Sequence, residues 1–203
     1  MDAIRELPPI AWVRVAGALV AGVLLTWFAR WYRQRRARKR LVSAVIAAGS
    51  KHLADVLVPD GMNGFYHVDF VLLTPRGILV VDLRDVRGNI FGGDQMTEWT
   101  VMDGSRRFTF TNPQSALYDR VAAVKAIVDD SPIDVPVEGR IVFTRRGKFP
   151  KGLPKWTLMV DSLRAEFPAV ERVDGPGPYD EAWQRIVEAV KPSSMNHARP
   201  IAG

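Results

Sequence analysis

The chain contains no cysteine, and this absence limits the kinds of site that it can build. Neither a disulfide framework nor a thiolate metal site is available, and the composition suits a reducing compartment. Histidine is also scarce, and His52, His67 and His197 do not have a metal-ligand spacing. No Gly-x-Ser-x-Gly motif occurs, and the glycine-rich "GNIFGGD" lacks the Lys-Ser/Thr of a phosphate-binding loop. These absences exclude a disulfide-stabilised secreted domain, a cysteine-ligated zinc site and the common nucleophile and nucleotide motifs.

Acidic residues are missing from one long stretch, because none lies between Glu6 and Asp55. Basic residues are concentrated in the same part of the chain: residues 1–40 hold nine of the 28 Lys and Arg but two acidic residues. The remaining residues carry 19 basic and 20 acidic side chains, so the net charge of +6 comes from the N-terminal segment. The basic composition is therefore no evidence that the rest of the chain binds nucleic acid, and such binding has to be argued from local features.

The segment Ile10–Ala29 is apolar apart from Arg14 and matches the ~20 residues that cross a bilayer. The basic segment 30–40 follows it directly, which predicts a cytoplasmic location for that flank and an extracytoplasmic location for residues 1–9. A signal peptide has the opposite order of charge and apolar run. We therefore expect a single-pass protein of the cell membrane with its C-terminal part in the cytoplasm. The basic flank either binds anionic lipid or acts as a topology signal alone.

Beyond residue 40, the pattern predicts an α/β domain at residues 41–190, in which helices pack on one sheet, followed by a disordered tail at 191–203. The "TPRG" and Asp103-Gly104 turns each predict a β-hairpin, while "GNIFGGD" is typical of turns. The basic run "TRRGKFPKGLPK" is either a solvated loop or a contact for a phosphate backbone. The expected helices are 41–58, 114–128, 161–167 and 179–190, and the expected strands are 65–73, 77–83, 96–102, 106–110, 139–144 and 157–160.

The first hairpin brings unusual charges to one face of the predicted sheet. If its turn is centred between Pro75 and Arg76, cross-strand partners have residue numbers that add up to 151. Asp69 then faces Asp82, and His67 faces Arg84. Facing carboxylates repel each other unless a bound cation, a shared proton or a basic neighbour compensates. Two readings stay open: a Mg²⁺ or Mn²⁺ site formed by both aspartates, and a metal-free ion cluster in which Arg84 is the counter-ion.

The order of these features resembles the nuclease-related (NERD) domain family. The resemblance covers about Leu41 to Phe149 and rests on "VPDGMNGFYHVDFVLLTPRGILVVDLRDVRGNIFGGD", then Trp99, "FTFTNPQ" and "GRIVFT". It implies a restriction-endonuclease-like PD-(D/E)xK fold, with a central mixed β-sheet flanked by helices. It also implies a phosphodiesterase that uses Mg²⁺ or Mn²⁺ and acts on nucleic acid.

Carried over by position, the resemblance makes Asp69, Asp82 and Arg84 the catalytic residues and Asp69 and Asp82 the metal ligands. Asp82 stands at the family's Glu or Asp before x-Lys, and Arg84 stands at the lysine. Arg84 is a departure, because a guanidinium stays charged and is bulkier than an ammonium. The glutamate of the family's first helix has no counterpart here.

These departures predict a weak or inactive nuclease, and they favour the ion cluster over the metal site. The alternative function is a non-catalytic binding or scaffold module at the cytoplasmic face of the membrane.

Overall fold

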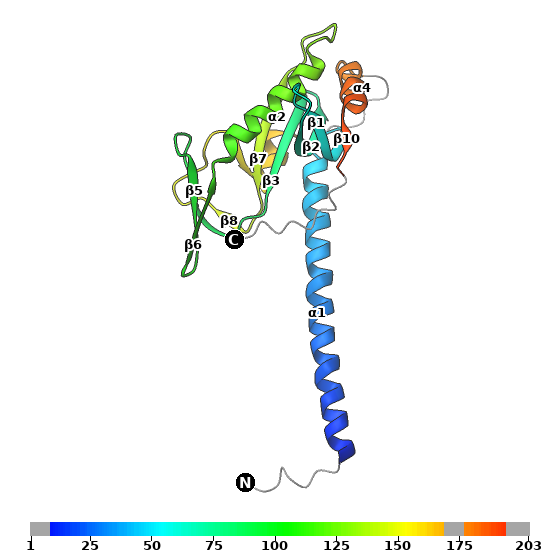
Figure 1. Cartoon of the computed structure of the whole chain (residues 1–203), viewed down its shortest axis with the longest axis vertical. Coiled ribbons are helices and arrows are strands. Elements are labelled where there is room, and N and C mark those ends of the chain that lie inside the picture. Colours follow the sequence, from blue (N-terminus) through cyan, green and yellow to red (C-terminus); the bar gives the residue numbers. More distant parts are fainter. Residues whose placement is uncertain (1–8, 169–176, 194–203) are drawn as a thin grey trace. The chain divides into compact units, whose positions relative to one another are not determined.

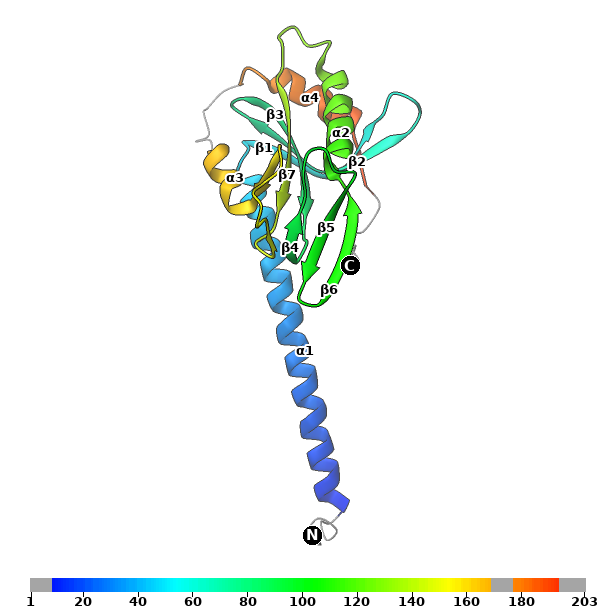
Figure 2. The same ribbon diagram turned by 90° about the vertical axis from the view of Figure 1, so that its left-hand side faces the viewer.

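The computed structural model describes residues 9–168 and 177–193, drawn as ribbons in Figures 1 and 2. Within this part of the chain, the side chains of residues 9–21, 34, 37 and 38 also lie outside the description. The chain forms two units, Met1–Val42 and Ser43–Gly203.

Helix α1 spans Pro9–Ile46 and contains the whole segment that the sequence predicts to cross a membrane. Its described part exposes large apolar side chains, among them Val23, Leu24, Leu25, Trp27 and Phe28. Across the side chains that the structure describes, no helix combines the length and the apolar character that a membrane span requires. The predicted span Ile10–Ala29 depends in part on residues 10–21, whose side chains lie outside the described ones, and the structure does not support it.

The helix predicted for residues 41–58 is wrong beyond Ile46, because strand β1 occupies Lys51–Pro59. Gly49 and Ser50 follow the end of the helix and lie beside β2 (Phe65–Thr74), where Ser50 N donates to Leu73 O at 2.8 Å. A Cβ at Gly49 would lie 2.8 Å from the same carbonyl oxygen, so the chain can pass this close to β2 only with glycine there. The apolar residues of "LADVLVP" fit both a helical and an alternating period, and pairing with β2 selects the strand.

The larger sheet has six strands in the order β10-β1-β2-β3-β7-β9. Strand β3 spans Gly77–Arg84 and pairs with β2 in the predicted register, from Thr74↔Gly77 to Phe70↔Val81. The prediction of partners whose numbers add up to 151 is therefore confirmed for these pairs. Strands β7 (Val137–Phe143) and β9 (Thr157–Met159) extend the sheet in parallel, so the sheet is mixed, as expected.

The second sheet was not predicted. It has four strands in the order β6-β5-β4-β8, and it corrects the expectation of one central sheet. The hairpin at Asp103-Gly104 is confirmed, with β5 at Glu98–Asp103 and β6 at Arg106–Thr111. Strands β4 (Gly88–Phe91) and β8 (Gly147–Lys148) occupy the segments expected to form turns and a loop. Trp99 is fully buried and packs against Phe110, Phe143 and Phe149, which joins the two sheets through one aromatic core.

Two parallel strand pairs, β3 with β7 in the larger sheet and β4 with β8 in the second sheet, have the same register. Residues of β3 pair with residues of β7 that lie 59 positions further along the chain, up to Arg84↔Phe143. The next strands keep this difference, because Gly88 pairs with Gly147 and Asn89 with Lys148. The links at 85–87 and 144–146 are therefore equal in length. They are tied by the Thr144 N to Arg84 O hydrogen bond of 3.0 Å.

Helices cover both faces of the larger sheet. Helix α2 (Pro113–Val128) lies on the face that contains Gly139, where a Cβ would lie 2.6 Å from Val121 Cγ2. Helix α4 (Asp180–Ala189) packs beside α2 through Trp183 and Ile186, as Figure 1 shows from the side. Helix α3 (Val160–Glu166) contacts Arg140, the next residue of β7, and therefore covers the opposite face. The structure is thus a mixed α/β fold with two mixed sheets.

The predicted tail also begins differently. Strand β10 (Lys191–Pro192) pairs with β1 through Leu57↔Lys191 and Val56↔Pro192, so the chain is still ordered where a disordered tail was expected. Backbone pairing with an edge strand does not require a hydrophobic pattern, so no pattern in residues 191–192 predicts this strand. Residues 194–203 lie outside the described part.

Candidate functional site

The charged ends of β2 and β3 form a cluster with β1 and α2. We call it the polar cluster, and its members are Asp55, His67, Asp69, Asp82, Arg84 and Arg120. Asp69 and Asp82 occupy the register position next to Phe70↔Val81, which puts them opposite each other on the face covered by α2. Instead of a backbone pair at this position, Asp69 Oδ2 accepts a hydrogen bond from Leu83 N at 2.8 Å. The structure therefore brings together the three site residues that the sequence predicts.

Asp82 is the buried centre of the polar cluster, with a side chain that is 5% exposed. Its Oδ2 accepts a hydrogen bond from Arg84 Nη2 at 2.7 Å and a longer one from Arg120 Nη1 at 3.4 Å. The two arginine side chains are 26% and 20% exposed. Burying a carboxylate is costly unless it is paired and hydrogen-bonded, and here two guanidinium groups meet that requirement.

Asp69 is held less favourably than Asp82. Burial raises the pKa of the Asp69 carboxyl above its ordinary value of 3.8, and the negative charge of Asp82 raises that pKa further. The Leu83 N–H and the positive charges nearby oppose the rise without cancelling it. The two arginines of the polar cluster therefore contact Asp82, and the negative charge of Asp82 disfavours the ionised form of Asp69.

His67 connects Asp69 to a third aspartate. Its Nε2 lies 2.7 Å from Asp55 Oδ1, and its Nδ1 lies 3.8 Å from Asp69 Oδ1. Asp55 is the residue of β1 opposite Asp69, and its backbone is left-handed, with φ of 58°. A non-glycine residue in that conformation is unusual and turns its side chain out of the regular alternation. The sequence does not indicate Asp55, because the pattern of its segment predicts a helix.

Arg120 is the second member that sequence reasoning missed. It lies on α2, where Leu117 and Val124 are buried three residues before it and four residues after it. It therefore lies on the helix face that packs against the sheet, and an arginine on an apolar face was a readable signal. Its Nε donates to His67 O at 2.6 Å, which fixes the guanidinium over the end of β2. Helix α2 thus provides a cation that the hairpin alone does not contain.

The donors of the polar cluster do not fit a divalent metal. A Mg²⁺ or Mn²⁺ site needs several free oxygen ligands around one point. Asp82 Oδ2 is already shared by two guanidinium groups, and Asp69 Oδ2 is used by a backbone N–H. Over residues 9–168 and 177–193, no three or more His, Asp and Glu side chains are grouped so that they could hold a metal ion. A metal that binds Asp82 Oδ2 would have to displace the two guanidinium groups that already contact it.

Arg84 contains a buried hydrogen-bond donor that no described residue satisfies. Its Nε is buried and has no hydrogen-bond partner in the described part of the chain, although its Nη2 is paired with Asp82. An unsatisfied buried donor typically costs ~1–3 kcal/mol. The Arg84 side chain therefore donates to Asp82 through Nη2, while no acceptor among residues 9–168 and 177–193 pairs with its Nε.

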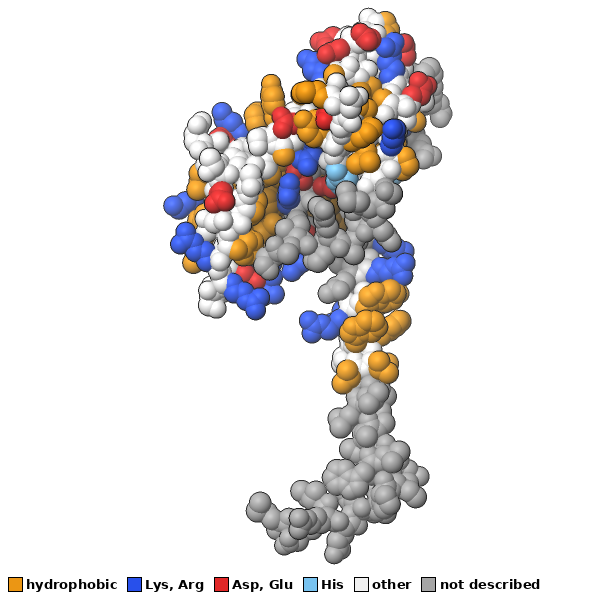
Figure 3. Space-filling model, viewed as in Figure 1, with side chains coloured by type: hydrophobic (Ala, Val, Ile, Leu, Met, Phe, Trp, Pro, Cys, Tyr) orange, Lys and Arg blue, Asp and Glu red, His pale blue; other side chains and the backbone are white. Residues whose placement is uncertain are grey.

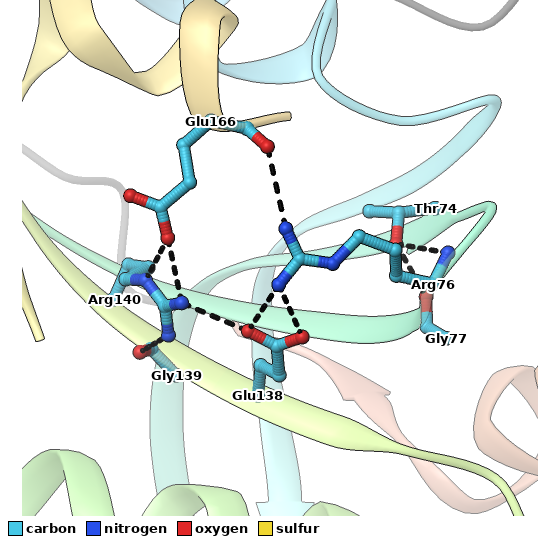
Figure 4. Close-up of polar contacts among 7 residues, drawn as sticks. All are labelled: Thr74, Arg76, Gly77, Glu138, Gly139, Arg140 and Glu166. Atoms are coloured by element: carbon cyan, nitrogen blue, oxygen red, sulfur yellow. Dashed lines mark hydrogen bonds and ion pairs between the residues drawn. The ribbon is translucent and has the colours of Figure 1, made fainter. Parts of the chain in front are cut away.

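A second ion network lies on the other face of the larger sheet and serves as a structural comparison (Figure 4). Glu138 accepts hydrogen bonds from Arg76 and Arg140, and Arg140 also donates to Glu166 of α3 at 2.7 Å. Both guanidinium groups lie over the Phe167 ring, 4.8 and 5.4 Å from its centroid. Charges of the two signs alternate in this network, and no two carboxylates face each other alone. This second network attaches α3 to the sheet, whereas the polar cluster contains the repelling carboxylates Asp69 and Asp82.

Comparison with protein families gives one match. The model of the nuclease-related domain matches residues 31–144, which include β1 to β7 and every member of the polar cluster. Neither the comparison with curated proteins nor that with solved structures gives a match.

Proposed function

Because the chain belongs to the nuclease-related domain family, we propose that it is a member that binds nucleic acid and is weak or inactive as a phosphodiesterase. One observation carries this proposal: two arginines neutralise Asp82, the carboxylate that corresponds to a metal ligand of the family. A nuclease-related function follows from the family, and the loss of efficient cleavage is our inference from these contacts.

The chemistry of the polar cluster argues against efficient cleavage. Metal-assisted hydrolysis of a phosphodiester needs a cation that activates water and stabilises the leaving oxygen. Guanidinium groups attract phosphate oxygens, but they do not generate a hydroxide at neutral pH, because arginine stays protonated. Arg84 and Arg120 therefore neutralise Asp82 without supplying the chemistry that breaks a phosphodiester.

We also propose that α1 places this domain at a membrane, with the domain on the cytoplasmic side. The support is the apolar run Ile10–Ala29, the basic segment 30–40 and the large apolar side chains that α1 exposes. Exposed apolar area of this kind is stabilised when it leaves water. Fractionation of cells that express the full chain tests this idea, and recovery of the chain in the soluble fraction would refute it. At a membrane, a domain that binds without cleaving could act as a scaffold.

The function is tested with the full chain, labelled DNA and RNA substrates, and added Mg²⁺ or Mn²⁺. We expect weak cleavage or none, at a rate close to that of the Asp69→Asn variant, and no rise in melting temperature with either metal. Ligands that bind only the folded state must stabilise it, so an unchanged melting temperature reports the absence of a metal site. Binding of nucleic acid in the presence of a chelator should persist.

A matched variant makes the test sharper. Arg84→Lys combined with Arg120→Gln removes both guanidinium groups and restores the lysine of the family pattern. We expect this variant, and not the parent chain, to be stabilised by Mn²⁺. Metal-dependent stabilisation together with efficient, Asp69-dependent cleavage in the parent chain would refute the proposal.

A further inference from the structure

Two similar tripeptides lie side by side in the second sheet. Arg87-Gly88-Asn89 enters β4, and Arg146-Gly147-Lys148 enters β8. The strands are parallel, and Gly88 pairs with Gly147 and Asn89 with Lys148. Side chains alternate between faces, so Arg87, Arg146, Asn89 and Lys148 fall on one face of the sheet. A pair of arginines is thereby followed by an amide and a lysine on the same surface.

These side chains line a pocket of about 250 Å³, which we call the β4–β8 pocket. Met102, Asp103 and Gly104 from the adjoining hairpin complete its lining. The volume is below the ~300–1,000 Å³ of typical pockets for organic cofactors, and it suits a small group such as a phosphate. Gly88 lets the strands approach, because a Cβ there would lie 2.5 Å from Met102 O, and its φ of 115° is strained for other residues.

The charge of the β4–β8 pocket is positive after its internal ion pairs are counted. Arg87 is paired with Asp103 at 3.3 Å and Arg146 with Asp85 at 2.8 Å, and both pairs are largely exposed. Lys148 is exposed and forms no ion pair with any residue of the described ranges. Exposed ion pairs contribute at most ~1 kcal/mol each, so the arginines can turn to an anion at little cost. Figure 3 shows Lys and Arg side chains gathered on the part of the domain formed by this sheet.

Arg84 of the polar cluster lies a few residues before the β4–β8 pocket along the chain. Arg84 ends β3, Gly88 begins β4, and four residues of extended chain span at most ~14 Å. Asp85, between them, accepts hydrogen bonds from Thr144 Oγ1 at 2.7 Å and from Arg146 Nη1 at 2.8 Å. A nucleic-acid strand carries a phosphate about every 3.4 Å of its axis, so one strand can reach both places.

We propose that the β4–β8 pocket binds a backbone phosphate of nucleic acid, through Arg87, Arg146 and Lys148 with Asn89 as a neutral donor. The choice of ligand rests on the proposed function, whereas the phosphate chemistry rests on the pocket itself. Arginine, lysine and asparagine are common partners of phosphate oxygens in nucleic-acid complexes. The basic run that includes Arg146 and Lys148 is, in this proposal, a ligand contact and not only a solvated loop.

The test compares neighbouring residues of one loop. Arg146→Gln/Lys148→Gln removes two cations from the pocket. Arg145→Gln is the matched control, because Arg145 is 78% exposed and pairs instead with Asp161 of α3, with Nε 2.7 Å from Oδ2. Binding of the full chain to a fluorescent single-stranded oligonucleotide is measured in a chelator between about 50 and 200 mM salt. Lys148→Glu is a second pocket variant, and a melting curve checks that each variant folds.

We expect the double variant to bind at least ~10-fold more weakly and to lower the salt slope by about 1.4, the value for two lost contacts to a single strand. Arg145→Gln should lower the slope by less than half of that amount. Equal losses in the control and the pocket variant would overturn the proposal, and so would an unchanged pocket variant. A parent chain that does not bind nucleic acid would instead refute the proposed function, and with it this choice of ligand.

Binding to vesicles of phosphatidylcholine and phosphatidylserine tests whether the pocket binds a lipid phosphate instead. If the pocket variants lose binding to these vesicles but keep full binding to the oligonucleotide, the proposal is wrong and the pocket recognises a lipid headgroup. If the parent chain cleaves nucleic acid with a metal while the pocket variants lose binding, the proposed function fails and the pocket assignment stands.

Discussion

The facing aspartates Asp69 and Asp82 have different surroundings, and their asparagine variants should change the stability of the fold in opposite directions. Asp82→Asn removes the carboxylate charge that Arg84 and Arg120 both contact. Asp69→Asn removes a charge whose formation is opposed by burial and by Asp82. Asparagine is close to aspartate in shape, and its carbonyl oxygen can still accept the hydrogen bond from Leu83 N.

The size of the Asp82→Asn effect follows from burial. Breaking a fully buried ion pair costs ~3–5 kcal/mol, because the remaining charge is left without a partner. Here the two guanidinium groups keep 26% and 20% of their exposure, so water can compensate in part. We expect a loss of about 2–3 kcal/mol. For a chain of this size, that loss lowers the melting temperature by ~4–12 °C.

The assay is thermal unfolding of the parent chain, both single variants and the double variant at neutral pH without metal. We expect Asp82→Asn to melt lower than the parent chain and Asp69→Asn to melt higher. The stabilisation by Asp69→Asn should shrink in the Asp82→Asn background, because part of the repulsion has already gone. If Asp82→Asn melts at or above the parent chain, the arginines do not compensate Asp82, and the argument for an ion cluster fails.

Two further outcomes are expected. The pKa of Asp69 is raised above 3.8, so the proton that the folded chain keeps on Asp69 favours folding at low pH, and this contribution is lost as the pH rises through the folded-state pKa. The melting temperature of Asp69→Asn relative to the parent chain should therefore increase from about pH 4 to 7. A constant difference in melting temperature would contradict the raised pKa. Gly139→Ala should lower stability by ~1–3 kcal/mol, because its Cβ would lie 2.6 Å from Val121 of α2. The control is Gly177→Ala, whose Cβ would meet no atom of the described residues within 4 Å, and it should melt like the parent chain.

The site was predictable where short-range pattern decides the structure. The β2–β3 hairpin has a clear turn and a period of two, and these fix which residues face each other. Asp69, Asp82 and Arg84 could therefore be placed together from the sequence. Arg120 was readable in principle, because it interrupts the apolar face of α2, but only the packing of that helix shows which end of the sheet it reaches.

The parts that could not be predicted depend on contacts between distant segments. The residues of β1 suit a helix and a strand equally, and the choice is made by eight pairs with β2. Strands β4 and β8 are too short to show a period, since β8 has two residues, and they form because the parallel register of β3 and β7 brings them together. Asp55 was missed for the first reason and the β4–β8 pocket for the second. The membrane span stays a prediction from residues 10–29.

The constant difference of 59 between paired residues has a consequence for how this protein tolerates change. The links 85–87 and 144–146 match in length, so β4 meets β8 in the alignment already set by β3 and β7. Insertion of one residue in either link would move the strand that follows it by one position and turn its side chains to the other face. Arg84 would keep its position, whereas the side chain of Asn89 or of Lys148 would leave the face that lines the β4–β8 pocket. The two links are therefore constrained as a pair, and a length change in one is compatible with both sheets only when the other link changes equally.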